Sequence, residues 1–164
     1  MNIPASAGEP PWLDAAEREA WLALARLLVH LEPALDSQLR REAGFGQFEY
    51  SVMSVLSEAQ ERTLRMSELA FLAQGSLSRL SQVVARLEKR GWVMREADPS
   101  DGRCTLARLT EAGWEQVVAA APGHVSEVRR LVFDQLTRAQ VGQLTTIGRR
   151  IMQGVDLDSG CPAS

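Results

Sequence analysis

Apolar residues follow a helical period along the first part of the chain. From Trp12 to about Arg41 they recur at spacings of three and four, which places them on one side of a helix. These positions are Trp21, Leu24, Leu28, Leu31, Leu35 and Leu39. Pro33 lies within the pattern and predicts a kink. A helix this long with an apolar stripe needs a second long helix, or another chain, to cover the stripe.

The same period predicts three shorter helices after a break at residues 43–46. The first covers Gln47 to Glu58 and is followed by a short polar stretch at residues 59–64. Ser67 can cap the second helix, and Ser76 can cap the third, which runs to Arg90. The core candidates on these helices are Phe48, Val52, Val55, Leu56, Leu69, Ala70, Leu72, Leu80, Val83, Val84 and Leu87.

After Gly91 the period changes from helical to alternating, which predicts two β-strands at residues 92–97 and 104–109. Residues 98–103 between them are dense in turn formers and charges, so we expect a hairpin with a charged tip. Thr110 can cap a fifth helix that runs toward Leu136, with a kink at Pro122–Gly123. Residues 137–140 form a capping box that opens a sixth helix.

The distribution of charge changes the picture more than its sum does. The chain has a net charge of −3 and a pI of about 5.5, which argues against a nucleic-acid partner. Between Ser76 and Arg108, however, seven Lys or Arg stand against four Asp or Glu. DNA binding requires a locally basic face and not a basic protein.

A short helix, a tight turn, a longer helix and a hairpin are the parts of a winged helix–turn–helix, whose second helix can enter the major groove of DNA. Arginine can donate two hydrogen bonds to guanine, glutamine can pair with adenine, and the helix start can hold a phosphate. The outward face of this helix therefore predicts DNA contacts at Ser76, Ser78, Arg79, Ser81, Gln82 and Arg86. The same residues could also form an ordinary solvated face.

The hairpin favours the DNA-binding interpretation over the solvated face. Arg103 at its tip can reach the neighbouring minor groove, as inserted arginines do in other proteins. Asp101 can support Arg103 through an ion pair.

Four segments in this order closely resemble the MarR family of bacterial transcription regulators: residues 66–70, residues 76–93, the Asp-Pro-Ser-Asp-Gly-Arg tip and the Leu-Thr-Glu-Ala-Gly exit at residues 109–113. The resemblance implies an obligate homodimer, double-stranded DNA with a pseudo-palindromic operator as partner, and most often repression. For many members it also implies a small phenolic or amphipathic effector between the dimer layer and the DNA-binding lobe. It makes Arg103 the wing arginine with Asp101 as partner, and puts Ser78, Arg79 and Gln82 where members read bases.

The expected fold is mainly α with a small β wing: a winged helix–turn–helix with N- and C-terminal dimerisation helices. We divide the chain into a flexible tail (1–11), an N-terminal dimerisation helix (12–42), a DNA-binding lobe (45–110), C-terminal dimerisation helices (111–153) and a second flexible tail (154–164). An effector cavity between the first, second and fifth helices could be lined by Trp21, His30, Tyr50, Met53 and Trp114, although each is also an ordinary core residue.

Other functions have less support in the sequence. Cys104 and Cys161 leave a cysteine redox-switched regulator open, but Cys104 suits the role of a half-buried filler. Neither catalytic residues, nor a metal site, nor a cofactor is predicted, since no metal-ligand spacing, Gly-rich phosphate loop or nucleophile–base pair is evident. A dimeric protein-interaction module that does not read DNA remains an alternative. The chain lacks a signal peptide and a membrane-spanning apolar run, so we expect it in the cytoplasm.

Overall fold

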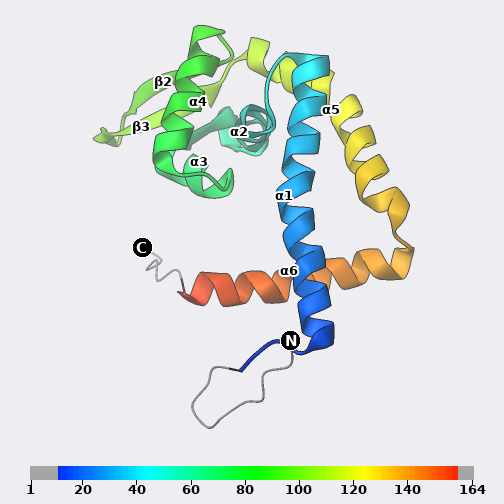
Figure 1. Ribbon diagram of the computed structural model, residues 1–164. Coiled ribbons are helices and arrows are strands. Elements are labelled where there is room, and N and C mark those ends of the chain that lie inside the picture. Colours follow the sequence, from blue (N-terminus) through cyan, green and yellow to red (C-terminus); the bar gives the residue numbers. More distant parts are fainter. Residues whose placement is uncertain (1–10, 159–164) are drawn as a thin grey trace.

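The structure, a computed structural model, describes residues 11–158 (Figure 1). It confirms a mainly helical fold with a small antiparallel sheet. The elements in chain order are α1 (Ala15–Ala43), α2 (Gln47–Glu58), a 3-10 turn (Gln60–Arg62), β1 (Thr63–Arg65), α3 (Met66–Leu72), α4 (Leu77–Lys89), β2 (Val93–Asp98), β3 (Asp101–Leu109), α5 (Glu111–Leu131), a second 3-10 turn (Phe133–Gln135) and α6 (Arg138–Asp158).

The long helix α1 begins at a capping box. The Asp14 carboxylate accepts a hydrogen bond from the Glu17 backbone N–H at 2.8 Å, and the Glu17 carboxylate accepts one from the Asp14 N–H at 2.9 Å. The helix therefore starts at Ala15 and not at Trp12. It is continuous through Pro33 and ends at Gly44, whose φ of 74° is the left-handed conformation that glycine adopts readily.

The start of α3 differs from the prediction. Ser67 does not cap this helix, which begins at Met66 directly after β1 and has no side-chain cap. The chain enters α3 from a strand that pairs with β3, with Thr63 opposite Arg108 and Arg65 opposite Leu106. A three-residue strand is too short to show an alternating pattern, so residues 63–64 were predicted as part of a polar stretch.

The hairpin is longer and its turn is tighter than predicted. The sheet has the order β1-β3-β2, and Asp98 at the end of β2 lies opposite Asp101 at the start of β3. The Asp98 carboxylate accepts hydrogen bonds from the Ser100 N–H at 2.8 Å and from its hydroxyl at 2.6 Å, which closes the turn. Arg103 consequently lies within β3, and its predicted place at the tip was wrong.

The hydrophobic core lies in the lobe that α2, α3, α4 and the sheet form with the adjoining ends of α1 and α5. Leu80, Val83, Val84 and Leu87 of α4 are all buried, as predicted from their spacing. Leu72, also a core candidate, is exposed because it lies at the end of the short helix α3.

The helices α5 and α6 leave this lobe. The Thr110 hydroxyl caps α5 by accepting from the Gly113 N–H at 3.1 Å. The helix contains Pro122 and ends at Leu131, before a 3-10 turn and not near Leu136. Figure 1 shows that α5 leads down from the lobe and that α6 then turns back beneath the lobe, crossing α1 in this view.

The predicted capping box of α6 is present, since the Thr137 N–H donates to the Gln140 side chain at 2.8 Å. The helix continues through Gly154 to Asp158, so residues 154–158 are not part of a tail. Its apolar spacing continues through Ile147, Ile151 and Val155, which favours helix past the glycine. The predictions for residues 1–10 and 159–164 lie outside the described residues.

Candidate nucleic-acid interface

The helix α4 presents a polar face opposite its buried side. Ser76 precedes the helix, and its hydroxyl accepts from the Arg79 N–H at 3.2 Å, so the predicted cap is present. Ser78, Ser81 and Gln82 are exposed. These side chains are short and neutral, and they can approach a groove closely.

Arg79 leans from α4 toward α1 and α2. Its guanidinium lies 4.1 Å from the centre of the Phe48 ring, and Nη2 lies 3.4 Å from a carboxylate oxygen of Glu32 on α1. The sequence placed Arg79 on the outward face with the serines. In the structure its guanidinium contacts its own chain.

Arg86, seven residues further along α4, contacts a buried carboxylate. Its Nε lies 3.2 Å from Oε1 of Glu49, whose side chain is only 8% exposed. The other oxygen of Glu49 accepts from the Gly46 N–H at 2.8 Å and so caps α2. Arg86 thus neutralises a buried charge that would be costly alone.

The wing carries the predicted ion pair between Arg103 and Asp101. Nε of Arg103 lies 3.0 Å from one oxygen of Asp101, and Nη2 lies 3.2 Å from the other. The side chain of Arg103 is 92% exposed and is therefore accessible to a partner. Hydrogen bonds from Arg103 lower the pKa of the Asp101 carboxyl, which keeps the supporting charge in place.

Sequence reasoning missed Arg65, which holds the wing from the other edge of the sheet. Nη2 of Arg65 lies 2.6 Å from the Asp98 carboxylate and 3.2 Å from the Ser100 hydroxyl. Hydrogen bonds from Ser100, together with the ion pair to Arg65, lower the pKa of Asp98 to about 2. The turn of the wing is thereby attached to the strand that leads into α3.

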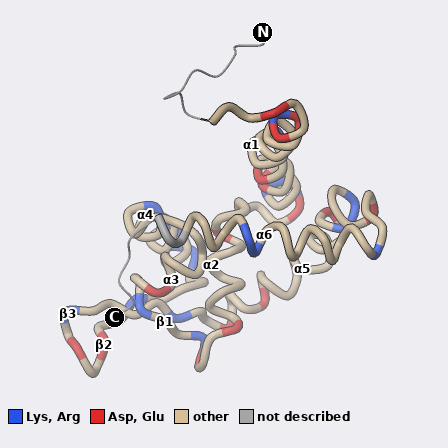
Figure 2. The backbone as a smooth tube through the Cα atoms, turned by 90° about the horizontal axis from the view of Figure 1, so that it is seen from below, with Lys and Arg blue, Asp and Glu red and all other residues tan. Residues whose placement is uncertain are grey.

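A hollow of about 360 Å³ lies between α4 and the wing. It brings the predicted residues Ser81 and Arg103 together with Arg65 and Arg95, which were not predicted. Its lining is Arg65, Met66, Ser67, Leu77, Ser81, Arg95, Arg103, Cys104 and Thr105. Figure 2 shows basic positions along α4, β1 and the hairpin. Three arginines and two serines around one hollow suit an anionic partner.

The residues proposed for an effector cavity are separated. Trp21 and His30 are exposed on α1, and Met53 is fully buried in the core. Trp114 is half-buried beneath the guanidinium of Arg62, at 4.7 Å. Tyr50 lies beside a residue outside that set, His124, with 4.6 Å between ring centres.

The Tyr50–His124 pair lines a cavity of about 290 Å³ between α2, the end of α3 and α5. Gln47 and Gln74 also line it. The Gln47 Oε1 and the His124 Nδ1 are buried without a hydrogen-bond partner, and burial lowers the pKa of His124. Such atoms are costly unless a ligand or water supplies the missing hydrogen bond.

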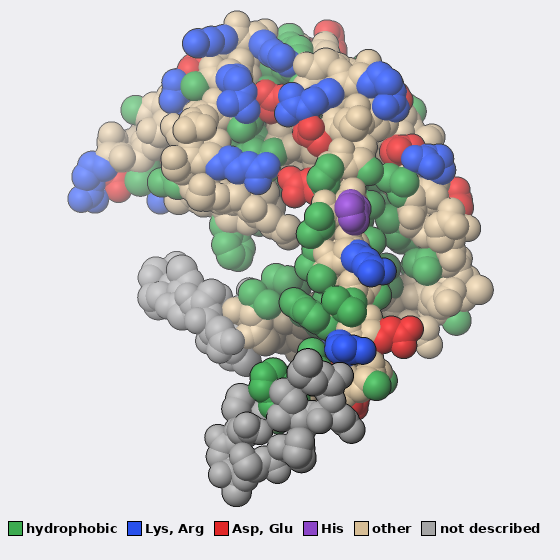
Figure 3. All heavy atoms as spheres, in the orientation of Figure 1, with side chains coloured by type: hydrophobic (Ala, Val, Ile, Leu, Met, Phe, Trp, Pro, Cys, Tyr) green, Lys and Arg blue, Asp and Glu red, His purple; other side chains and the backbone are tan. Residues whose placement is uncertain are grey.

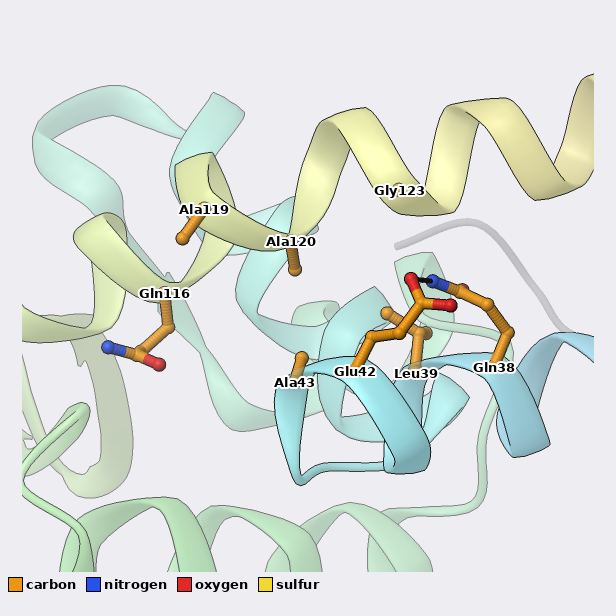
Figure 4. Close-up of a pocket in the computed structure, with 8 residues that line it drawn as sticks. All are labelled: Gln38, Leu39, Glu42, Ala43, Gln116, Ala119, Ala120 and Gly123. Atoms are coloured by element: carbon orange, nitrogen blue, oxygen red, sulfur yellow. Dashed lines mark hydrogen bonds between the residues drawn. The ribbon is translucent and has the colours of Figure 1, made fainter.

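A second cavity, of about 220 Å³, lies between α1 and α5 (Figure 4). Its Gln38 side chain is 2% exposed and donates to Glu42 at 2.6 Å, while its Oε1 has no partner. Gly123 leaves space for this pair, because a Cβ there would lie 2.8 Å from the Glu42 carboxylate. This cavity belongs to the packing of α5 against the end of α1.

Cys104 is half-buried, with Sγ 3.7 Å from the Asp101 carboxylate, whereas Cys161 lies outside the described residues. Within residues 11–158, we find no cluster of three or more His, Cys, Asp or Glu placed to hold a metal ion. No helix in that range has the length and hydropathy needed to cross a membrane.

Comparison with known proteins assigns the family. Residues 48–105 match the family model described as MarR family. A crystal structure of Sco3205, a MarR family transcriptional regulator from Streptomyces coelicolor in complex with DNA, is 46% identical; the match covers 90% of this chain and 92% of that one, with a TM-score of 0.86. CouR from Rhodococcus jostii RHA1, bound to p-coumaroyl-CoA, is 25% identical with a TM-score of 0.71 over 85% of this chain and 95% of that one.

Among curated proteins, the transcriptional repressor MprA of Escherichia coli K12 is 25% identical over 138 residues, covering 82% of this chain and 78% of that protein. Sco3205 and MprA are named as regulators of transcription. The protein belongs to the MarR family of transcriptional regulators.

Proposed function

We propose that this protein is a sequence-specific DNA-binding transcription regulator of the repressor type, which binds a pseudo-palindromic operator as a homodimer. One observation carries the proposal: Ser81 on the exposed face of α4 and the exposed Arg103 of the wing line the same hollow, together with Arg65 and Arg95. The DNA complex of Sco3205, 46% identical to this chain, supports it. A regulator of this kind acts where the bacterial chromosome lies, so we place it in the cytoplasm.

The contacts divide by position. The side chains proposed to contact base edges in the major groove lie on α4: Ser78, Arg79, Ser81 and Gln82. Ser76 and the free backbone N–H groups at the start of the helix are proposed to bind a phosphate. Arg103 is proposed to enter the minor groove. Arg65 and Arg95, which line the hollow, are proposed to add phosphate contacts, and Arg86, further along α4, is proposed to add another.

The dimer follows from the apolar side chains that the lobe leaves uncovered. Large hydrophobic residues on α1, α5 and α6 are between 42% and 65% exposed: Trp21, Leu28, Val125, Leu144, Ile147 and Ile151. Large apolar side chains exposed in this number are typical of a surface that binds another protein chain. We propose that residues 12–42 and 111–153 form the dimer layer and that residues 45–110 form the DNA-binding lobe.

The test begins with selection of bound sequences from a random pool of duplexes. The wild type is then compared with Gln82→Ala, Arg103→Ala and a control, Arg138→Ala at the start of α6. We expect an inverted repeat, a loss of about 1–3 kcal/mol for Gln82→Ala confined to one base position, and a salt slope lower by about 1 for Arg103→Ala. Failure to enrich any sequence, with the variants behaving as wild type, would favour the protein-interaction module.

A response to a small ligand is a second proposed function, favoured by the two unpaired buried atoms around the Tyr50–His124 cavity. A phenolic hydroxyl can donate to Gln47 Oε1, while its ring packs against Tyr50 and His124. Gln74 also lines the cavity and belongs to the turn before α4, so a ligand here would contact the segment that positions α4. The p-coumaroyl-CoA complex of CouR supports an aromatic effector.

Calorimetric titration with 4-hydroxybenzoate tests this second proposal. We expect binding that His124→Phe and Gln47→Leu each weaken by about tenfold, since each variant removes one polar partner. Operator affinity without ligand should stay at the wild-type value. Equal binding by wild type and both variants would exclude this cavity as the effector site.

A further inference from the structure

The contact between Arg79 and Glu32 connects the proposed base-reading helix to α1. We infer that Glu32 is an internal competitor of DNA: it holds Arg79 against α1 in the free protein, and DNA must displace it to engage Arg79. The inference rests on the proposed DNA-binding function. It adds a regulatory contact within the chain.

In the free protein Arg79 already has an anionic partner, the Glu32 carboxylate, in the place that a DNA phosphate or base edge would take. Cζ of Arg79 lies over the Phe48 ring, 4.1 Å from its centre, and Nη2 lies 3.4 Å from the Glu32 carboxylate. Both contacts stabilise the positive charge of Arg79: the carboxylate through an ion pair and the Phe48 ring through a cation–π interaction. A hollow of about 240 Å³ adjoins the pair; Asp36, Arg40, Glu49, Arg79, Gln82 and Arg86 take part in its lining. In Figure 3 acidic side chains lie among the basic ones between α4 and α1.

The exposure of the two ion pairs on α4 shows which one DNA can replace. Glu49, the partner of Arg86, is 8% exposed and caps α2, so removing its arginine would leave a buried charge unpaired. Arg79 and Glu32 are instead 52% and 61% exposed, and water can solvate either one when they separate. An exposed pair is weak, so a phosphate or a guanine edge can replace Glu32 as the partner of Arg79.

The position of Glu32 makes the competition adjustable. Glu32 lies on α1, which we propose to be a dimerisation helix, whereas Arg79 lies on α4 in the DNA-binding lobe. A displacement of α4 relative to α1 changes the distance between the two charged groups. The availability of Arg79 for DNA thus depends on the relative position of the lobe and the dimer layer.

The test is a double-mutant cycle in which binding to the selected operator is measured by fluorescence anisotropy at low and moderate salt. Glu32→Gln keeps the shape of the side chain and removes its charge. We expect it to tighten operator binding about two- to fivefold, the usual range for an exposed ion pair, and to have no effect in the Arg79→Gln background. Glu19→Gln, the same change at an exposed position nearer the start of α1, is the matched control and should not couple to Arg79.

The outcomes separate the two proposals. A wild type that selects no operator contradicts the proposed function. If the wild type binds its operator, but Glu32→Gln has no effect or the same effect with Arg79 and with Gln at position 79, the competition by Glu32 is overturned and the proposed function stands. The side-chain Nε–H signal of Arg79 in ¹⁵N NMR spectra gives a readout without DNA: Glu32→Gln should move it and Glu19→Gln should not, and an unmoved signal also overturns the inference.

Discussion

Asp98 illustrates what a single carboxylate contributes to the wing. It accepts two hydrogen bonds from Ser100 and pairs with Arg65, so that it joins the turn to strand β1. These contacts lower its pKa to about 2 from an ordinary value of 3.8. A lowered pKa in the folded state means that the contribution of Asp98 to stability is complete above pH 3.8 and is lost as the pH falls toward 2.

Replacing Ser100 by Ala should therefore raise the pKa of Asp98 toward 3.8, because the hydroxyl hydrogen bond is the largest cause of the shift. The carboxyl carbon of Asp98, followed by ¹³C NMR during an acid titration, measures this directly. The Asp98→Asn variant, in which no such titration occurs, identifies the signal. A pKa that stays near 2 in Ser100→Ala would show that Arg65 and the backbone N–H are sufficient.

At this scale, sequence reasoning found local partners and missed distant ones. Asp101 and Arg103 are two positions apart on one strand, so their ion pair could be predicted from spacing. Arg65 and Asp98 are far apart in the chain and meet only because β1 pairs with β3. The direction of Arg79 could not be predicted either, since it depends on Phe48 and Glu32 from two other helices.

The junction between the sheet and α5 is a close contact between two backbone segments. Gly113 lies in the first turn of α5, where an added Cβ would be 2.2 Å from the backbone oxygen of Trp92. The same oxygen accepts the Thr110 N–H at 2.9 Å, so the chain before β2 and the start of α5 are held together. Neither backbone segment can move away without breaking this hydrogen bond.

Gly113→Ala should consequently destabilise the protein by about 1–3 kcal/mol, the cost of overpacking a close contact. Chemical denaturation followed by circular dichroism measures the free energy of unfolding. Gly102→Ala is the control, because nothing lies within 4 Å of a Cβ at that position. Equal stability of Gly113→Ala and the wild type would mean that the sheet and α5 are less closely joined than the structure shows.

Elements with a strong period or cap were predicted well from the sequence. The buried side of α4, the Ser76 and Thr110 caps and the hairpin all follow from local signals. The strand β1 was missed because three residues carry too little pattern. The α6 helix was predicted too short because a glycine was taken as its end, although the apolar spacing continues beyond it.

For the whole molecule, the apolar side of α6 gives the clearest test of assembly. Leu144, Ile147 and Ile151 are 42%, 55% and 47% exposed in the single chain. An Asp at position 147 would place an unpaired charge in the proposed dimer layer, at a cost of about 3–5 kcal/mol. Ile147→Asp should therefore sediment as a monomer of 18.0 kDa or lose its fold, whereas the wild type sediments as a dimer.

Thr145→Asp adds the same charge on another side of α6 and should leave the dimer intact. Thermal unfolding at several concentrations distinguishes a folded monomer from an unfolded chain, since only the dimer gains stability with concentration. A dimer that survives Ile147→Asp would place the interface elsewhere on the chain.

The concentration of arginines on α4 and the wing has a consequence for the rate of association with DNA. A protein of net charge −3 with an excess of basic residues on α4 and the wing has an uneven charge distribution, and therefore an electric dipole moment. At distances beyond the Debye length, about 8–10 Å at physiological salt, screening removes most of the net repulsion by DNA. Only at closer range does the dipole turn the basic face toward the duplex, so lowering the salt should accelerate encounter less than it does for a uniformly basic protein.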